Sequence, residues 1–456
     1  MVNFDIDEAT AGETARAVTE GKISALEACD AAIARIEARD GSVHAVVVRD
    51  FERARAAAQA FDAAGDRRAS PLAGVPITVK ESHDVAGLPT TWGFAQFASL
   101  PVTADSVAVA RLKAAGAIVL GKTNVPVALG DWQAANPVYG RTLHPHDPSR
   151  TPGGSSGGAA AALATRMVPL ELGSDIGGSI RVPAHLCGVF GHKPTYGLVP
   201  MQGHAFPTTD GAEFDLAVLG PMARCAADLA LALDIVAGPL PGSAYRLALP
   251  PPRHASLAEH RVLVLDAHPV AGTDAAVREP IAALAEALAA AGARVLRHHD
   301  ALPDLTRAHA DYRDMLLTIL SRGTPNATPV DAHAWMSLKD AQARLARRWQ
   351  RLFDDIDVVL TPPFGVTAFA HDDRPDWADR RLVIDGAETP YGVQMAWPGL
   401  ATFPGLPATA APLGLSRAGL PTGVQIIGDL FADRTTIAFA GLLEQAGLAT
   451  VPRPPR

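Results

Sequence analysis

The sequence predicts an α/β fold: a single large domain with a mixed, largely parallel twisted β-sheet that helices cover on both faces. Three apolar runs bounded by Gly and Pro, "GVPITVK", "GAIVLGK" and "RVLVLDA", have the composition of buried strands. Alanine-rich segments with helical periodicity alternate with such runs, which is typical of a sheet buried between two helical layers. Since no linker-like segment interrupts this alternation, residues 1–456 are predicted to form one domain, although the length would allow two or three.

Two amphipathic helices are predicted first, between Ala9 and Arg39. The second of them follows Ser24, and Glu27 three residues later completes a capping-box pattern. The segment "VARLKAAGAIVLG" predicts a helix and then a strand, with Gly116 ending the helix and Gly121 ending the strand.

The second half of the chain contains one clear strand–helix–strand unit between His254 and Asp304. Its parts are "RVLVLD", "TDAAVREPIAALAEALAAAG" and "ARVLRH". The stretch from Ala308 to Ala370 is less regular. Within it, "DAQARLARRWQRLFDDI" predicts a helix that leads into the strand "DVVLTPP".

Composition excludes several classes of partner. The chain has 48 acidic and 40 basic residues, a net charge of −8, whereas nucleic acids and anionic membranes select a basic face. We therefore expect no nucleic-acid partner. The uncharged stretch 389–416 contains five prolines, and the first residues lack a signal-peptide pattern, so neither a membrane association nor secretion is expected.

The three cysteines indicate a reducing, cytoplasmic location. They are odd in number, far apart and without metal-ligand spacing, so neither a disulfide framework nor a zinc site is predicted: Cys29, Cys187 and Cys225. We expect no metal and no other cofactor. The sequence leaves a homodimer open.

Two short motifs match known patterns without the required context. "GAIVLGKT" fits the phosphate-loop pattern, but its middle residues form an apolar strand instead of a glycine-rich turn, so we do not predict a nucleotide site. "GGSSG" fits the nucleophile elbow with Ser155 at its centre. The preceding "HPHDPSRTP" cannot supply the strand that an elbow needs, which disfavours an α/β-hydrolase.

A third set of residues suits amide chemistry. Lys80 ends the strand of "AGVPITVKES", Ser155 and Ser156 lie in "TPGGSSGGAA", and Ser179 follows a glycine pair in "GSDIGGSIR". A serine hydroxyl needs a base to become a good nucleophile, and no histidine adjoins these serines. A lysine, with an ordinary pKa of about 10.4, becomes a base near neutrality when burial lowers its pKa. The apolar strand around Lys80 would provide that burial.

These stretches, together with "GLPTTWG", "GHKPTYGLVP", "GLPATAAP" and "GLPTGVQIIG", resemble the amidase signature family of serine hydrolases. The resemblance runs from the first helices to "DRTTIAFAGLLEQAG". It implies that Ser179 is the nucleophile, that Ser155 bridges to the base after a cis peptide bond with Gly154, and that Lys80 is the base. It also identifies "GAIVLGKTN" as a structural element.

The resemblance also assigns an oxyanion hole and supporting residues. Small consecutive residues in "DIGGS" allow several backbone N–H groups to converge on a developing oxyanion. The implied donors are the N–H groups of Ile176, Gly177, Gly178 and Ser179. Three residues are implied to hold the site by hydrogen bonds: Ser156, Asp175 and Arg181.

The segment "TNVPVALGDWQAANPVYG" resembles the fatty acid amide hydrolase branch and related bacterial amidases. This implies that Leu129, Trp132 and Ile176 contact the substrate, and it favours an apolar or aryl acyl group. The expected reaction is hydrolysis of the C–N bond of a small-molecule amide through an acyl-enzyme on Ser179. Three alternatives remain: a carbamate or ester hydrolase with the same triad, the amidase subunit of a tRNA-dependent amidotransferase, and an inactive binding module, which the intact triad disfavours.

Three regions are distinguished within the domain. Residues 70–240 are expected to form the signature core, 241–390 a variable substrate-specificity region, and 391–456 the C-terminal part of the core. The region from Ala308 to Trp397 is expected to determine leaving-group specificity.

Overall fold

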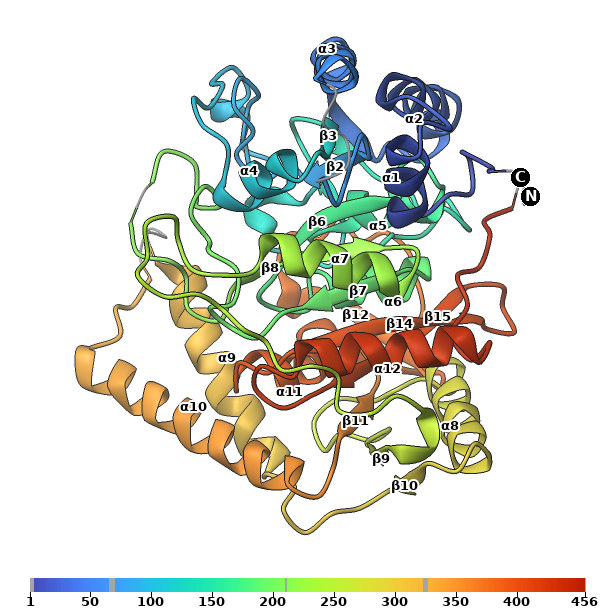
Figure 1. Ribbon diagram of the computed structural model, residues 1–456. Coiled ribbons are helices and arrows are strands. Elements are labelled where there is room, and N and C mark those ends of the chain that lie inside the picture. Colours follow the sequence, from blue (N-terminus) through green and yellow to red (C-terminus); the bar gives the residue numbers. More distant parts are fainter. Residues whose placement is uncertain (1–3, 65–69, 210, 323–326, 456) are drawn as a thin grey trace.

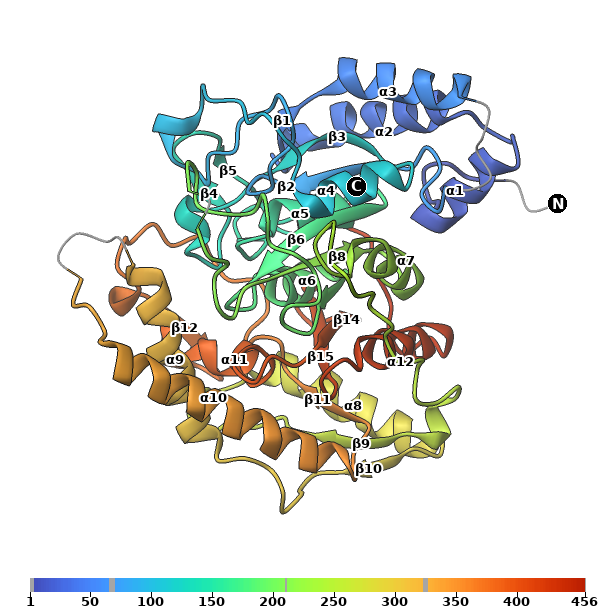
Figure 2. The ribbon, with the colours of Figure 1, turned by 60° about the vertical axis from the view of Figure 1, so that its left-hand side comes forward.

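One 11-stranded sheet runs through the whole molecule in the computed structural model (Figures 1 and 2). The structure describes residues 4–64, 70–209, 211–322 and 327–455, so 1–3, 65–69, 210, 323–326 and 456 lie outside the description. In sheet order the strands are β1 (Val46–Arg49), β3 (Ile118–Thr123), β2 (Pro76–Lys80), β6 (Leu170–Asp175), β8 (Val218–Ala223), β7 (Phe190–Lys193), β14 (Ala408–Leu415), β15 (Pro421–Ile427), β11 (Val358–Thr361), β9 (Arg261–Val264) and β10 (Arg294–Leu296).

The predicted single α/β domain with a mixed sheet is confirmed, and the parallel pairs are confined to two outer groups. Strands β3, β2 and β6 are parallel, and so are β11, β9 and β10. The strands between these groups pair antiparallel. Chain connectivity explains one of these antiparallel pairs. Only a few residues join β14 to β15, and such a short connection allows a hairpin but not a parallel crossover.

Helices cover both faces of the sheet. They are α1 (Ala11–Thr19), α2 (Ala25–Arg39), α3 (Phe51–Ala63), α4 (Val107–Ala114), α5 (Gly157–Ala164), α6 (Arg181–Cys187), α7 (Ala226–Val236), α8 (Ala275–Ala290), α9 (Leu305–Ser321), α10 (Ala332–Phe353), α11 (Ala396–Thr402) and α12 (Asp433–Gln445). Figure 2 shows α7 and α12 on one side of the central strands, with α9, α10 and α11 on the other. Helix α5 is buried along its whole length, as expected for a helix that is apolar on every side.

Successive apolar side chains of strands β9 and β11 pack on opposite faces of the sheet. In β9, Val262 and Val264 belong to one buried apolar cluster, while Leu263 belongs to the other. In β11, Leu360 belongs to the first of these clusters and Val359 to the second. Successive strand residues point to opposite faces, so these apolar runs fill both cores at once.

Most predicted elements are confirmed. Helix α2 begins after Ser24, whose side chain accepts from the N–H of Glu27 while the Glu27 carboxylate accepts from Ser24 N–H. The unit β9–α8–β10 is present with parallel strands. Helix α10 begins before the predicted segment. Helix α9 was not predicted, although it spans Leu305–Ser321.

The prediction that Gly121 ends its strand is wrong. Strand β3 continues to Thr123, and its pairing with β2 shifts by one residue between Ile77 and Thr78. A Cβ atom on Gly121 would lie 2.0 Å from the carbonyl oxygen of Val48 in β1. The glycine therefore permits a bulge against the neighbouring strand instead of ending the element.

The proline-rich stretch 389–416 folds into the end of β13 (Ala387–Pro390), helix α11 and strand β14. The short strands β12 (Arg381–Ile384) and β13 form a separate hairpin, as do β4 (Ala135–Asn136) and β5 (Gly140–Arg141). None of the helices in the described part of the chain has the length and apolar composition needed to cross a bilayer.

Candidate active site

Lys80 is the last residue of β2 and is completely buried. Its Nζ lies 2.6 Å from Ser155 Oγ and 2.9 Å from Ser174 Oγ. Strand β2 runs between β3 and β6 in the parallel group, so its carboxyl end faces the end of β6, where Ser174 lies. The structure thus brings together the lysine and the first serine that the sequence predicted, and it adds Ser174.

Ser155 lies in a tightly packed loop before α5. The peptide bond between Gly154 and Ser155 is cis, as the resemblance implied. A Cβ atom on Gly154 would lie 2.4 Å from the carbonyl oxygen of Asp131 and 2.5 Å from that of Gln133. Only glycine fits between Ser155 and the segment 131–133 at this approach.

Ser179 is held beside this loop by the backbone. The N–H of Ser156 donates to the carbonyl oxygen of Ser179 at 3.1 Å, and the Ser179 side chain is buried. Ser156 stands at the N-cap of α5 without a side-chain capping bond. Its Oγ instead donates to the carbonyl oxygen of Ser174 at 3.4 Å, which agrees with a supporting role.

Burial lowers the pKa of Lys80 to about 7, although the negative charge of Asp175 partly opposes the effect. Burial also raises the pKa of Glu171 to about 8, so this carboxyl group is largely protonated near neutrality. Glu81 faces away from the amine and accepts from the N–H groups of Thr91 and Trp92. The lysine therefore has a substantial neutral population near pH 7.

A lowered pKa does not by itself single out Lys80. Burial also lowers the pKa of Lys122 to about 8 and that of Lys193 to about 7. Lys122 donates to Thr90 and to a backbone carbonyl, and Lys193 donates to the carbonyl of Pro194. Of these three lysines, Lys80 is the one hydrogen-bonded to serine hydroxyl groups.

The loop after β6 presents backbone N–H groups next to Ser179. No acceptor among the described residues bonds the N–H groups of Ile176, Gly177 and Ser179, which leaves them open to a substrate oxygen. The N–H of Gly178 differs from the expectation because it already donates to Asp175 Oδ1 at 2.9 Å. Gly178 serves the backbone turn instead, at φ 93°.

Two aromatic side chains hold the carbonyl groups of this loop. Trp132 Nε1 donates to the carbonyl oxygen of Gly177, and the Tyr312 hydroxyl donates to that of Ile176, both at 2.8 Å. With its carbonyl groups fixed, the loop keeps its N–H groups oriented before a substrate arrives. Such preorganisation is what an oxyanion hole requires.

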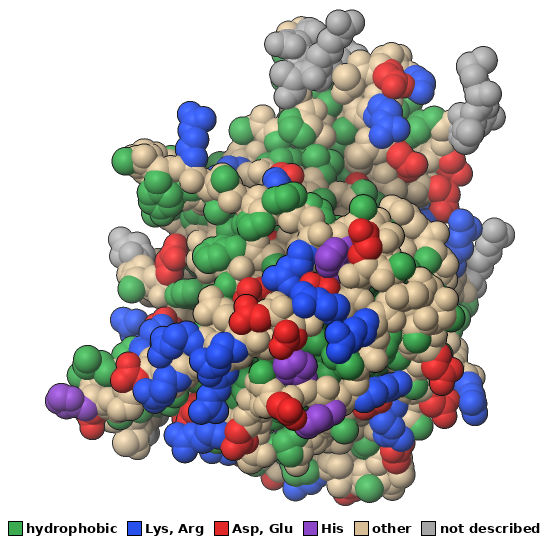
Figure 3. Space-filling view, turned by 60° about the horizontal axis from the view of Figure 1, so that its bottom comes forward, with side chains coloured by type: hydrophobic (Ala, Val, Ile, Leu, Met, Phe, Trp, Pro, Cys, Tyr) green, Lys and Arg blue, Asp and Glu red, His purple; other side chains and the backbone are tan. Residues whose placement is uncertain are grey.

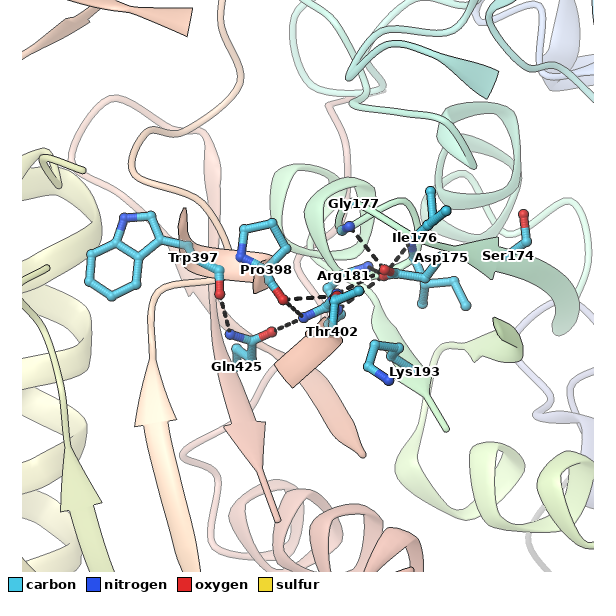
Figure 4. A network of polar contacts seen from close by, with 12 residues as sticks. Ser174, Asp175, Ile176, Gly177, Arg181, Lys193, Trp397, Pro398, Thr402 and Gln425 are labelled. Carbon is cyan, nitrogen blue, oxygen red and sulfur yellow. Dashed lines mark hydrogen bonds and ion pairs between the residues drawn. The ribbon is translucent and has the colours of Figure 1, made fainter. Parts of the chain in front are cut away.

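Asp175 and Arg181 form a buried ion pair beneath the loop (Figure 4). Burial alone would raise the pKa of Asp175, but the charge of Arg181 outweighs it and holds the pKa at about 2. Arg181 continues to the carbonyl oxygen of Pro398 at 2.9 Å, to Thr402 Oγ1 at 2.8 Å and to Gln425. This network ties the loop to α11 and β15, so both residues have the predicted supporting geometry.

The expected pocket residues have different surroundings. Trp132 is 2% exposed, and its ring packs against Phe364, Trp377 and Tyr391. This tryptophan supports the loop through its hydrogen bond to the Gly177 carbonyl, and its contact with substrate stays a prediction. Leu129 and Ile176 are half-buried, and their contact with substrate stays a prediction.

The Leu129 backbone is unusual. Ala128 and Leu129 both have left-handed conformations, with φ values of 55° and 58°. Such conformations are uncommon for residues other than glycine and cluster near functional sites. The turn leads into the 131–133 segment that packs on Gly154.

Sequence reasoning missed three residues of this site: Ser174, Glu171 and Tyr312. The two residues on β6 could have been noticed as polar side chains in a strand that is buried along its whole length and leads to the serine motif. Tyr312 lies on α9, 136 residues from its partner Ile176, and no local pattern indicates that contact.

The rejected motifs are explained by the same geometry. The phosphate-loop match, residues 116–123, consists of the turn after α4 and strand β3, with no glycine-rich turn before a helix. Ser155 follows a loop instead of a strand, and within the described residues neither Ser155 nor Ser179 is hydrogen-bonded to a histidine. Both observations agree with the sequence-based rejection of a nucleotide site and of an α/β-hydrolase elbow.

Comparisons with known proteins agree with these features. The amidase family model matches residues 27–321 and 312–437. AtzE of Pseudomonas sp. (strain ADP), which belongs to a 1-carboxybiuret hydrolase, is 34% identical over 96% of this chain and 98% of that protein. A glutamyl-tRNA(Gln) amidotransferase subunit of Deinococcus deserti is 32% identical over 98% of both chains. The solved structure of 6-aminohexanoate cyclic dimer hydrolase superposes with a TM-score of 0.83 at 27% identity and covers 99% of both chains.

Proposed function

This chain belongs to the amidase signature family of hydrolases, and on that basis we propose that it cleaves the C–N bond of a small-molecule amide through an acyl-enzyme on Ser179. The observation that supports this most directly is the 2.6 Å contact between Lys80 Nζ and Ser155 Oγ in a buried site. A buried lysine with a pKa of about 7 is a base of suitable strength for a serine relay at neutral pH.

Acylation begins with neutral Lys80. Its Nζ accepts the Ser155 hydroxyl proton while Ser155 Oγ accepts the proton of Ser179 Oγ. The freed oxygen of Ser179 attacks the amide carbonyl carbon, and the carbonyl electron pair moves onto its oxygen. The N–H groups of Ile176, Gly177 and Ser179 stabilise this oxyanion, which is the largest contribution expected in such a site.

The relay then runs in reverse. The oxyanion collapses to a carbonyl, the C–N bond breaks, and the leaving nitrogen takes the proton held by Ser155, which Lys80 replaces. Water attacks the acyl-enzyme with its proton passing along the same route to Lys80. Release of the acid restores both hydroxyl groups and neutral Lys80, so the cycle is balanced in protons.

An apolar or aryl acyl group suits the half-buried side chains near the nucleophile. Ile176 lies three residues before Ser179 on the loop 176–179, which we call the oxyanion loop. Leu129 lies on the turn that leads into the segment 131–133, which packs on Gly154. Apolar walls with a few fixed polar groups are typical of small-molecule sites. Carbamates and esters pass through the same tetrahedral oxyanion, so the arrangement also suits those substrates.

Two of the relatives favour a second candidate, a chain that works with a partner protein. The relative from Deinococcus deserti is one component of a glutamyl-tRNA(Gln) amidotransferase, and AtzE is likewise one component of its hydrolase. This chain would then need a partner protein for its physiological reaction. Turnover of simple amides by the purified chain alone, without glutamine hydrolysis, would oppose this candidate.

Intact-protein mass spectrometry after exposure to a fluorophosphonate tests the nucleophile. We expect one adduct on the wild-type protein, slower labelling of Ser155→Ala and no adduct on Ser179→Ala. Ser156→Ala is the matched control and should still be labelled. An adduct that disappears only in Ser155→Ala would overturn the assignment and restore the elbow interpretation.

A further inference from the structure

A cavity of about 200 Å³ lies between α9 and α10, away from the serine residues. We call it the α9–α10 cavity. Its lining residues are Pro303, Asp304, Arg307, Ala308, Asp311, Ala341, Arg344, Leu345, Arg348 and Phe403. The alanines, one on each helix, leave space that larger side chains would fill in a closely packed helix pair.

Cationic groups converge on one side of the α9–α10 cavity. Arg344 and Arg348 are four residues apart on α10 and therefore project from the same face of the helix. Arg344 is 3.9 Å from Asp340, and within the described residues Arg348 has no ion-pair partner. Figure 3 shows Lys and Arg side chains gathered on this part of the surface.

The two carboxylates of the lining are already engaged. Asp304 caps α9 by accepting from the N–H of Arg307 at 3.0 Å. Asp311 binds the Arg307 guanidinium at 2.8 and 3.0 Å. Arg348 therefore has no ion-pair partner among the described residues, and Arg344 has only its 3.9 Å pair with Asp340; both side chains are exposed. The opposite wall carries negative charge that disfavours a dianion.

A second, mostly apolar cavity next to the α9–α10 cavity contains two histidine side chains without full hydrogen bonding. This smaller cavity, of about 10 Å³, adjoins the first at Ala308 and Leu345 and is lined by His268 and His309. Among the described residues, the buried nitrogens His268 Nε2 and His309 Nδ1 have no hydrogen-bond partner. Burial lowers the pKa of both imidazoles, so they are neutral hydrogen-bonding groups. Buried polar atoms without partners need a water or a ligand.

From this arrangement we propose that the α9–α10 cavity is a second ligand site for a small organic monocarboxylate with an aryl or alkyl body. Arg344 and Arg348 bind the carboxylate by charge-assisted hydrogen bonds. Ala308, Leu345 and Phe403 contact the apolar body.

The α9–α10 cavity lies close to the oxyanion loop. Asp311 lines the cavity, and the following residue, Tyr312, donates to the carbonyl oxygen of Ile176. The Tyr312 ring also packs so closely on Gly399 that a Cβ atom there would lie 2.6 Å from it. An occupant of the cavity is thus separated from the oxyanion loop by one helix.

Titration calorimetry with benzoate tests the proposal without using turnover, so its outcome is independent of the proposed function. We expect benzoate to bind, benzamide of the same shape to bind at least about tenfold more weakly, and Arg344→Gln/Arg348→Gln to weaken benzoate about tenfold or more. Arg347→Gln, exposed on the same helix but outside the lining, is the matched control and should bind normally.

A second variant separates a ligand site from a packing defect. Ala341→Leu fills the cavity, so we expect a folded protein with equal or higher thermal stability and no benzoate binding. Unchanged benzoate affinity in either variant would place the ligand at the serine site and overturn the proposal. Equal binding of benzamide or of inorganic phosphate would also overturn it.

Discussion

Replacing Lys80 by methionine is expected to stabilise the protein at pH 7 while abolishing amide hydrolysis. Burial lowers the pKa of this amine from its ordinary 10.5 to about 7. In the unfolded chain the amine is protonated at pH 7, so keeping it neutral in the folded state costs roughly 5 kcal/mol. Methionine has a similar volume and removes this cost.

The substitution also removes favourable contacts. Lys80 Nζ is hydrogen-bonded to Ser155 Oγ and to Ser174 Oγ, and losing these bonds in a buried site costs about 1 to 1.5 kcal/mol each. The expected net change at pH 7 is therefore a stabilisation of about 2 kcal/mol. Activity is lost because methionine cannot accept the proton of Ser155.

The sign of the stability difference should change with pH. Between the folded pKa of about 7 and the unfolded value of 10.5, the unfolded chain binds one proton more than the folded chain. Raising the pH through this window therefore stabilises the wild type and not the variant. Near pH 10.5 only the lost hydrogen bonds remain, and Lys80→Met should be less stable than the wild type.

Urea unfolding of both proteins at pH 7 and at alkaline pH measures the difference. Lys22→Met is a suitable control, because this side chain is 61% exposed and its replacement removes a lysine without removing a buried amine. A Lys80→Met protein that is already less stable at pH 7, or a difference that does not change with pH, would refute the reasoning that burial keeps this amine neutral.

Three further predictions concern the same site. The wild-type kcat/KM for an anilide should rise about tenfold per pH unit below a pH of about 7 and then level off, because only neutral Lys80 accepts the proton; a pH–rate profile that is flat across this range would oppose the base role. Asp175→Asn should lower the free energy of unfolding in urea by roughly 3 to 5 kcal/mol, since it leaves Arg181 charged and buried, and a loss below about 1 kcal/mol would contradict this account. Trp132→Phe should lower kcat about tenfold with little change in KM, because the Gly177 carbonyl loses its 2.8 Å hydrogen bond, and an unchanged kcat in steady-state assays would show that the bond does not orient the loop.

The parts of the site that depend on local backbone requirements could be predicted from the sequence. The glycines around Ser155 and before Ser179 form short patterns that carry the family resemblance. That resemblance singled out Lys80 and Ser155, which the structure places in contact, and Asp175 and Arg181, which form an ion pair. Helix starts were predictable for the same reason, since a cap and its partner are three residues apart.

The contacts that orient the site could not be predicted in this way. Trp132 and Gly177 are 45 residues apart, and Tyr312 and Ile176 are 136 apart. Each is a single hydrogen bond from an aromatic side chain to a backbone carbonyl, and no residue type is required at the accepting end. From the sequence alone, Trp132 therefore could not be distinguished from any other apolar residue of a pocket segment.

The wrong prediction for Gly121 shows why the alternation of residues along a strand could not predict which side chains surround Lys80. In β3 the one-residue shift opposite Ile77 and Thr78 pairs Lys80 with Thr123. A strand that ended at Gly121 would have left Lys80 without this neighbour, and Thr123 could not reach Glu171, which it now contacts at 2.7 Å. A one-residue shift turns side chains to the opposite face, so the bulge determines which groups of β3 lie beside the catalytic strand. It depends on the close approach of Val48 in β1, a strand far earlier in the chain, and for that reason it is a property of the assembled sheet and not of the segment that contains it.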